Sequence, residues 1–86
     1  MNDRELAAEL RSMYDQAKRN EAACQIHLFG IKYAEELLQC GSPLKHILEL
    51  SGIPHGYLSE ISKGIKLAQY VTIRKEGNED AGNSDR

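Results

Sequence analysis

The clearest structural pattern of the chain lies in the segment Ile47-Leu48-Glu49-Leu50-Ser51-Gly52-Ile53-Pro54-His55-Gly56-Tyr57-Leu58-Ser59-Glu60-Ile61-Ser62-Lys63-Gly64. Its first half supplies apolar side chains for one helix face, and Gly52 can adopt the left-handed backbone that a sharp helix-to-helix turn requires. Leu58 and Ile61 lie three residues apart and can hold a second helix on the same core. Small, polar or charged residues fill the remaining positions of that helix, as an exposed face requires. The segment therefore predicts two short helices joined by a tight turn.

The boundaries of these helices follow from glycine and proline. Gly41-Ser42-Pro43 suits a helix end, an N-cap and a first helical turn in that order, so one helix should run from Leu44 to Leu50 or Ser51. Pro54 opens the next helix, which should run to about Lys63 and be closed by Gly64.

Two longer helices are predicted before this segment. Residues 3–19 carry apolar side chains at helical spacing, and Asn2 or Asp3 can cap them. A second helix should run from about Glu21 to Cys40, with an apolar stripe broad enough for contacts on more than one side. Gly30 lies inside it, where we expect the close approach of a neighbouring helix rather than a kink.

The C-terminal part has a different pattern. Residues 70–74 alternate and are rich in β-branched side chains, so we expect a strand that pairs with a second copy or lies extended on the helices. Residues 76–86 hold one alanine and no larger apolar residue, which predicts a disordered acidic tail. The expected fold is all-α, a small bundle of about four helices with one short strand. Its single domain covers residues 1–75, divided into a two-helix support and dimerisation part (1–40), the paired short helices (42–66) and the strand (69–75).

The segment from residue 44 to residue 64 resembles the helix-turn-helix of small bacterial and phage repressors, in the lambda-repressor-like and lactose-repressor-like groups. In those groups a run of the form Ile-Ala-Glu-Leu-Ala-Gly-Val-Ser precedes Thr-Val-Ser-Arg-Val and a closing glycine. The residues that match this pattern in kind are Ile47, Glu49, Leu50, Gly52, Ser59 and Gly64, and those that match in character are Ile53, Leu58 and Ile61.

The resemblance implies a sequence-specific DNA-binding regulator of the repressor type, with helix 54–63 in the major groove of double-stranded DNA. Independently of it, two cysteines are too few for a disulfide scaffold and the first residues lack the order of a secretory signal, which predicts a cytoplasmic protein. The implied candidates for base contacts are His55, Tyr57, Ser59, Glu60 and Lys63. The candidates for phosphate contacts are Lys45, Lys66, Arg74 and Lys75. We also expect a homodimer, because the strand lacks a partner and the core is small.

Charge is distributed unevenly along the chain. The net charge is −2, but residues 41–75 hold five basic residues against two acidic ones, whereas residues 76–86 hold four acidic residues against one basic one. The positive segment favours an anionic partner such as DNA. The acidic tail can bind a basic protein or compete with DNA in cis. The alternative function is therefore a protein-interaction adaptor of the antitoxin-like or anti-repressor-like type.

Other classes of protein fit the sequence less well. No apolar run is long enough to cross a membrane, and the first residues lack the order of a secretory signal. Cys24 and Cys40 on one helix would lie roughly 24 Å apart, too far for a disulfide or a shared metal. His27 and His46 near them do not complete a metal-binding spacing. We expect no enzyme activity, no cofactor and no metal.

Overall fold

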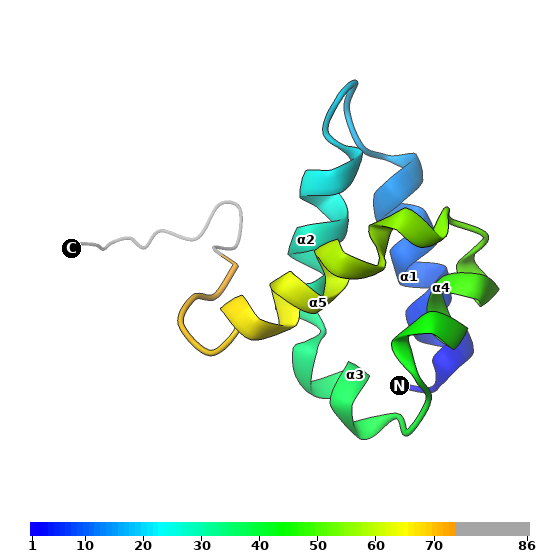
Figure 1. Cartoon of the computed structure of the whole chain (residues 1–86), viewed down its shortest axis with the longest axis vertical. Coiled ribbons are helices and arrows are strands. Elements are labelled where there is room, and N and C mark those ends of the chain that lie inside the picture. Colours follow the sequence, from blue (N-terminus) through cyan, green and yellow to red (C-terminus); the bar gives the residue numbers. More distant parts are fainter. Residues whose placement is uncertain (74–86) are drawn as a thin grey trace.

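Five α-helices and one 3-10 turn form in residues 1–73, the part of the chain that the computed structural model describes (Figure 1). The elements are α1 (Asp3–Asp15), α2 (Ala22–Lys32), α3 (Ala34–Gln39), α4 (Leu44–Ser51), the 3-10 turn η1 (His55–Tyr57) and α5 (Leu58–Leu67). The expected all-α fold is confirmed, with five helices rather than four. Within these residues, none of the helices combines the length and the apolar character that crossing a bilayer requires.

The first helix begins as expected and ends early. Asn2 Oδ1 accepts a hydrogen bond from the Glu5 amide at 2.8 Å, and the Asn2 amide donates to Glu5 Oε1 at 2.9 Å, so the two residues form a capping box. The helix stops at Asp15 instead of residue 19. Asn20 adopts a left-handed conformation (φ 66°) that reverses the chain toward α2.

The long helix predicted from residue 21 to residue 40 is two helices. Tyr33, with φ −111° and ψ 23°, departs from helical geometry and separates α2 from α3. Its ring lies 5.2 Å from the ring of Phe29, and its hydroxyl donates to Glu9 Oε1 at 3.3 Å. These contacts hold Tyr33 against α1 and α2, so α3 leaves in a new direction. The break therefore follows Gly30 by three residues and does not coincide with it.

Gly30 and Gly64 form the contact at which α5 crosses α2 (Figure 1). A Cβ atom on Gly30 would lie 2.5 Å from the carbonyl oxygen of Ile61 and 3.0 Å from Cα of Gly64. The expectation of a close helix approach at Gly30 is confirmed. The expectation that Gly64 closes its helix is wrong, because α5 continues to Leu67 and Gly64 is buried in its interior. Backbone thus meets backbone where the two helices cross.

One core joins the N-terminal helices to the C-terminal ones. α4 packs against α1, whereas α5 packs mainly against α2. The largest fully buried side chains come from all four of these helices: Leu6, Leu10, Ile26, Phe29, Ile47, Leu48 and Ile61. The first two helices therefore carry the last two on a shared apolar core.

The connection between α3 and α4 differs from the expectation in one position. Gly41 has the left-handed backbone (φ 81°) expected after a helix end. Pro43, rather than Ser42, occupies the N-cap of α4, and its carbonyl accepts from the amides of His46 and Ile47. The Ser42 hydroxyl donates instead to Asp3 Oδ2 at 3.4 Å.

The expected C-terminal strand is wrong as far as the described residues reach. The amides of Tyr70 and Val71 donate to the carbonyl of Leu67, which winds the chain into a turn after α5. Residues 71–73 have no regular structure, and no strand occurs anywhere in residues 1–73. Without a partner strand in that range, these backbone groups bond locally to the end of α5. Arg74, Lys75 and the acidic tail 76–86 lie outside the described residues.

Candidate nucleic-acid interface

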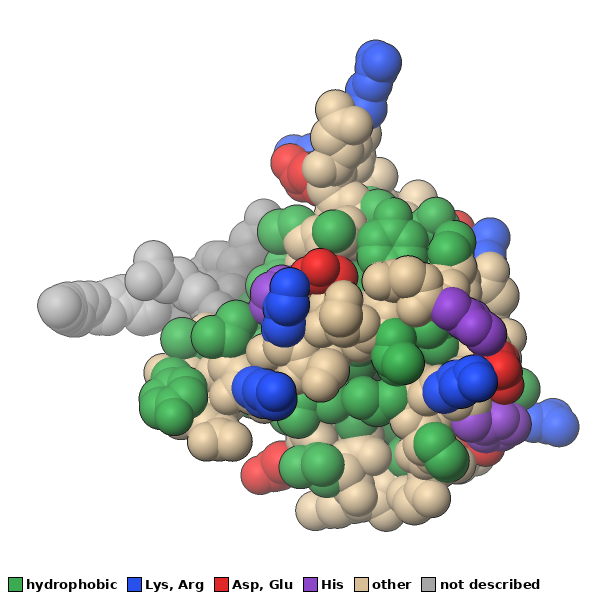
Figure 2. Space-filling model, viewed as in Figure 1, with side chains coloured by type: hydrophobic (Ala, Val, Ile, Leu, Met, Phe, Trp, Pro, Cys, Tyr) green, Lys and Arg blue, Asp and Glu red, His purple; other side chains and the backbone are tan. Residues whose placement is uncertain are grey.

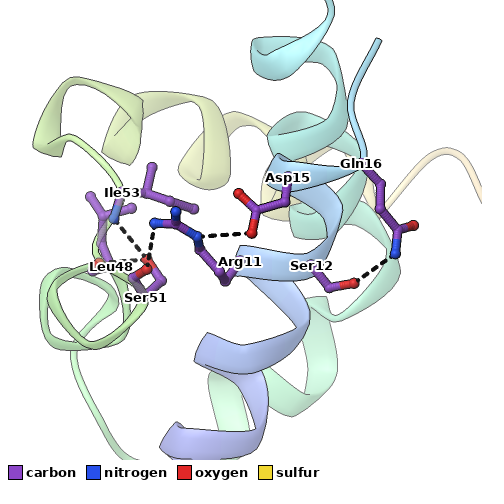
Figure 3. A network of polar contacts seen from close by, with 7 residues as sticks. All are labelled: Arg11, Ser12, Asp15, Gln16, Leu48, Ser51 and Ile53. Carbon is purple, nitrogen blue, oxygen red and sulfur yellow. Dashed lines mark hydrogen bonds and ion pairs between the residues drawn. The ribbon is translucent and has the colours of Figure 1, made fainter.

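The turn between α4 and α5 is the best-defined element of the candidate site. Gly52 caps α4 with a left-handed backbone (φ 77°), as the sequence predicts. The Ser51 hydroxyl is buried, donates to the carbonyl of Leu48 at 2.6 Å and accepts from the amide of Ile53 at 3.3 Å (Figure 3). Ile53 is buried in the core. The turn is therefore fixed by one side chain that satisfies polar backbone groups on both of its sides.

Arg11 of α1 supports this turn from outside the helix pair. Its Nη1 donates to the carbonyl of Ser51 at 3.3 Å, and its Nε donates to Asp15 Oδ2 at 3.1 Å (Figure 3). Sequence analysis assigned no role to Arg11 or Ser51. The sequence contains a weak indication for Ser51, because a small residue precedes the turn glycine in the family pattern. Nothing in the sequence pairs Arg11 with a carbonyl forty residues away.

Replacing Ser51 with alanine should destabilise the turn. The variant leaves the buried amide of Ile53 without its partner, which costs about 1–2 kcal/mol and lowers the midpoint of thermal unfolding by about 5–15 °C. Circular dichroism at 222 nm measures the shift. Ser59→Ala is the control, because Ser59 is exposed on α5 and should change the midpoint little. Equal midpoints for the two variants would contradict the role given to Ser51.

The sequence predicts a recognition helix from residue 54 to residue 63, and the observed segment starts differently. Pro54 is extended (φ −56°, ψ 141°), residues 55–57 form η1, and α5 proper starts at Leu58. Ile61 is fully buried and Leu58 is partly buried, as their spacing predicts. The segment therefore turns its apolar side to the core and leaves the opposite side open.

Three of the five base-contact candidates lie on the open side. Ser59 and Lys63 are exposed, and their spacing of four residues places them on the same face of α5. His55 is exposed in η1, with Nε2 3.8 Å from Glu49 Oε2. The three exposed side chains are distributed from the N-terminal to the central part of the segment.

The other two candidates are half-buried and contact α1 or α2. Tyr57 is half-buried, and its ring meets the ring of Tyr14 edge-on with centroids 5.7 Å apart. The carboxylate of Glu60 lies 3.2 Å from His27 Nδ1 and 3.8 Å from Lys63 Nζ. Tyr57 therefore packs α5 against α1, and Glu60 connects α2 to the exposed Lys63.

His27 is a residue of this region that sequence analysis considered only for metal binding. Its Nδ1 contacts Glu60, while its Nε2 is buried and has no hydrogen-bond partner among residues 1–73. Within the same range, no three side chains from histidine, cysteine, aspartate and glutamate gather as metal ligands. The contact between α2 and Glu60 depends on the tertiary fold, so no spacing along the chain could reveal it.

The phosphate-contact candidates in the described range are exposed. Lys45 lies in the first turn of α4 and Lys66 in the last turn of α5, and neither has a carboxylate within 4 Å among the described residues. Figure 2 shows lysine or arginine side chains at separate points over α4 and α5, with apolar and neutral polar side chains between them. Arg74 and Lys75, the other two candidates, lie outside the described residues.

Comparison with known proteins gives one family. The sequence model of a family described as an HTH-like domain matches residues 2–74. No curated protein and no solved structure matches the chain. The family match extends from the cap of α1 to beyond α5, so it includes α1, α2 and α3 as well as the segment that the sequence motif covers. Its description names no group of repressors.

Proposed function

We propose that this chain, which belongs to the family of HTH-like domains, binds double-stranded DNA with α5 and regulates transcription. The observation that carries the proposal is the two-sided character of α5. Its inner side is fixed by the Gly30–Gly64 crossing on α2, and its outer side exposes Ser59 and Lys63. A rigid helix with one open, cationic and sterically small side suits insertion into the major groove.

The dimensions of the segment fit this role. An α-helix with its side chains is about 10–12 Å in diameter, and the major groove of B-DNA is about 12 Å wide, so α5 (ten residues, about 15 Å long) can lie in the groove. We assign Lys63 to a guanine, whose O6 and N7 accept hydrogen bonds, and Ser59 to a neighbouring base edge or phosphate. His55 at the start of the segment faces the same groove. Lys45 and Lys66 contact the phosphates on either side.

Glu60 has a positioning role in this proposal. Its carboxylate lies between His27 and Lys63, so it orients the lysine from the side of α2. Glu60 is half-buried, and its two carboxylate oxygens lie near His27 Nδ1 and Lys63 Nζ. We therefore place Glu60 behind Lys63, and Tyr57 in the support of α5.

The regulator is proposed to act as a homodimer that occupies an operator. Two copies related by a twofold axis present two α5 helices to two half-sites, which doubles the contact area. Binding of such a protein to a promoter excludes other proteins from the same DNA.

Lys63→Ala should relax the sequence preference of the protein at one base pair. Loss of one good base contact reduces discrimination there by about 5- to 150-fold, while positions read by other residues keep their preference. Selection of bound sequences from a randomised pool of duplexes, carried out for the wild type and the variant, measures this change. Lys32→Ala removes the same charge at the end of α2 and should leave the selected motif unchanged.

The basic test is the salt dependence of DNA binding. The logarithm of the binding constant should fall steeply with the logarithm of the salt concentration when measured by fluorescence anisotropy on a labelled duplex. Absence of salt-sensitive binding at low ionic strength would overturn the proposal. The adaptor function, with the same helices on another protein, would then be the better interpretation.

A further inference from the structure

Exposed apolar side chains gather near the C-terminal end of the described chain. We call residues 67–73 the arm. Within it the exposed fractions are 41% for Leu67, 81% for Tyr70, 44% for Val71 and 36% for Ile73. Figure 2 shows apolar side chains protruding near the point where the description of the chain ends. A cluster of this kind on a small protein marks a surface that another molecule covers.

An apolar groove lies beside the arm. It encloses about 380 Å³ between the end of α3, the start of α4 and α5, and its apolar lining includes Leu37, Leu38, Leu44 and Ile65. Leu38 on α3 is 72% exposed. No residue of the arm lines the groove, although Ile65 precedes the arm by only two residues.

Backbone hydrogen bonds wind the start of the arm onto the end of α5. The amide of Tyr70 donates to the carbonyl of Leu67 at 2.8 Å, and the amide of Val71 donates to the same carbonyl at 3.0 Å. These bonds fasten the first half of the arm to the last turn of α5. The chain thus has an apolar groove and an apolar segment, and neither covers the other.

Charge makes the two features complementary. Residues 33–44, which form the α3 side of the groove, contain Glu35 and Glu36 and no lysine or arginine. Residues 61–75 contain no acidic residue, and Lys66 immediately precedes the arm. Lys66 and Glu35 are exposed, and neither has an ion-pair partner among the described residues. An arm laid along α3 of another copy brings opposite charges together.

We propose that the groove of each copy takes the arm of a second copy, so that two chains exchange arms about a twofold axis. The inference deepens the proposed function, since it rests on the proposed homodimer and names its surface. A twofold exchange fills both grooves with one type of contact, Leu38 against the apolar side chains of the arm. Ile65, which lines the groove, lies in α5, and the arm follows directly from α5. The exchange therefore also fixes the two recognition helices relative to each other.

The first test replaces apolar side chains that are exposed in the single chain. Tyr70→Ser with Ile73→Ser, or Leu38→Ser alone, should raise the dimer dissociation constant at least about 30-fold in sedimentation equilibrium without DNA. Leu50→Ser is the control, because Leu50 is exposed on α4 and does not line the groove. A wild-type chain that stays monomeric, or a dimer that the arm and groove variants leave intact, would overturn the inference.

Exchanging the charges at positions 35 and 66 tests whether the arm docks on another copy or on its own chain. Glu35→Lys and Lys66→Glu should each weaken self-association about tenfold, since each brings like charges together twice in the dimer. An equimolar mixture of the two variants should regain wild-type affinity, because a heterodimer pairs opposite charges at both contacts. A mixture no tighter than the separate variants would overturn docking between copies.

The outcomes distinguish this inference from the proposed function. A chain that dimerises through the arm and shows no salt-sensitive DNA binding would retain the inference and lose the function. A chain that binds DNA with salt-sensitive affinity, yet has the same dimer affinity in the arm variants, would lose the inference alone.

Discussion

Gly64→Ala should lower the midpoint of thermal unfolding by about 10–20 °C, which corresponds to about 2–3 kcal/mol for a domain of this size. A Cβ atom at this position would overlap the carbonyl oxygen of His27 and lie 3.0 Å from Cα of Gly30. All of its near neighbours are backbone atoms, so no side chain can rotate away. The two helices must separate, and the core that they share loses contacts.

A second glycine provides the matched control for this prediction. Gly56 has no atom within 4 Å of its ideal Cβ position and does not have a positive φ, so Gly56→Ala should leave the midpoint within a few degrees of the wild type. The comparison separates crowding at the crossing from the general effect of adding a methyl group. A Gly64→Ala variant as stable as Gly56→Ala would show that α2 and α5 do not cross as closely as described.

Local patterns in the sequence were sufficient for much of the fold. The turn at Gly52 was predicted from neighbouring residues, and so was a cap at Asn2 or Asp3, of which the structure has Asn2. Gly30 could be identified as a close approach because a glycine in a buried helix face has few other uses. Its partner Gly64 could not be identified in this way, because a glycine three residues before the end of a helix has the same local signal as a glycine that ends it. Only the crossing of two distant helices distinguishes them.

The errors have the same origin. Tyr33 breaks the long helix through contacts with Phe29 and Glu9, neither of which changes the apolar periodicity of residues 21–40. The alternation in residues 70–74 is typical of a strand, but a strand needs a partner, and residues 1–73 offer none. Tertiary contacts therefore overrode the first pattern, and the lack of a partner strand in residues 1–73 left the second without a ladder.

In the candidate site, too, local patterns predicted some residues and tertiary contacts determined the others. The helical period separates buried Ile61 from exposed Ser59 and Lys63, and the structure agrees with that division. It does not indicate that Glu60 meets His27 of another helix. The sequence was therefore sufficient to predict which side chains face outward. The residues that orient these side chains could be identified only from the packing of α5 on α2.

Removing three lysines from the proposed interface should cause the largest loss of DNA affinity. In the variant Lys45→Ala, Lys63→Ala, Lys66→Ala, each of the two lost phosphate contacts, at Lys45 and at Lys66, removes about 0.9 from the slope of log affinity against log salt, so the magnitude of the slope should fall by about 2. At about 0.1 M salt, where each phosphate contact contributes about eightfold, loss of the two phosphate contacts should lower affinity roughly 60-fold. Loss of the guanine contact of Lys63 should lower it by about a further 5-fold or more. Anisotropy titrations at several salt concentrations measure both quantities. Removal of Lys63 also frees Glu60, which adds repulsion from DNA.

A triple variant with the same change in net charge tests whether position matters. Lys18 and Arg19 lie in the connection between α1 and α2, and Lys32 ends α2, so none of them belongs to α4 or α5. Their replacement by alanine should leave the slope nearly unchanged, because only counterions released from contacted phosphates enter it. Equal losses in the two variants would mean that overall charge, and not the face formed by α4 and α5, attracts the DNA. An unchanged slope in the interface variant would remove that face from DNA binding altogether.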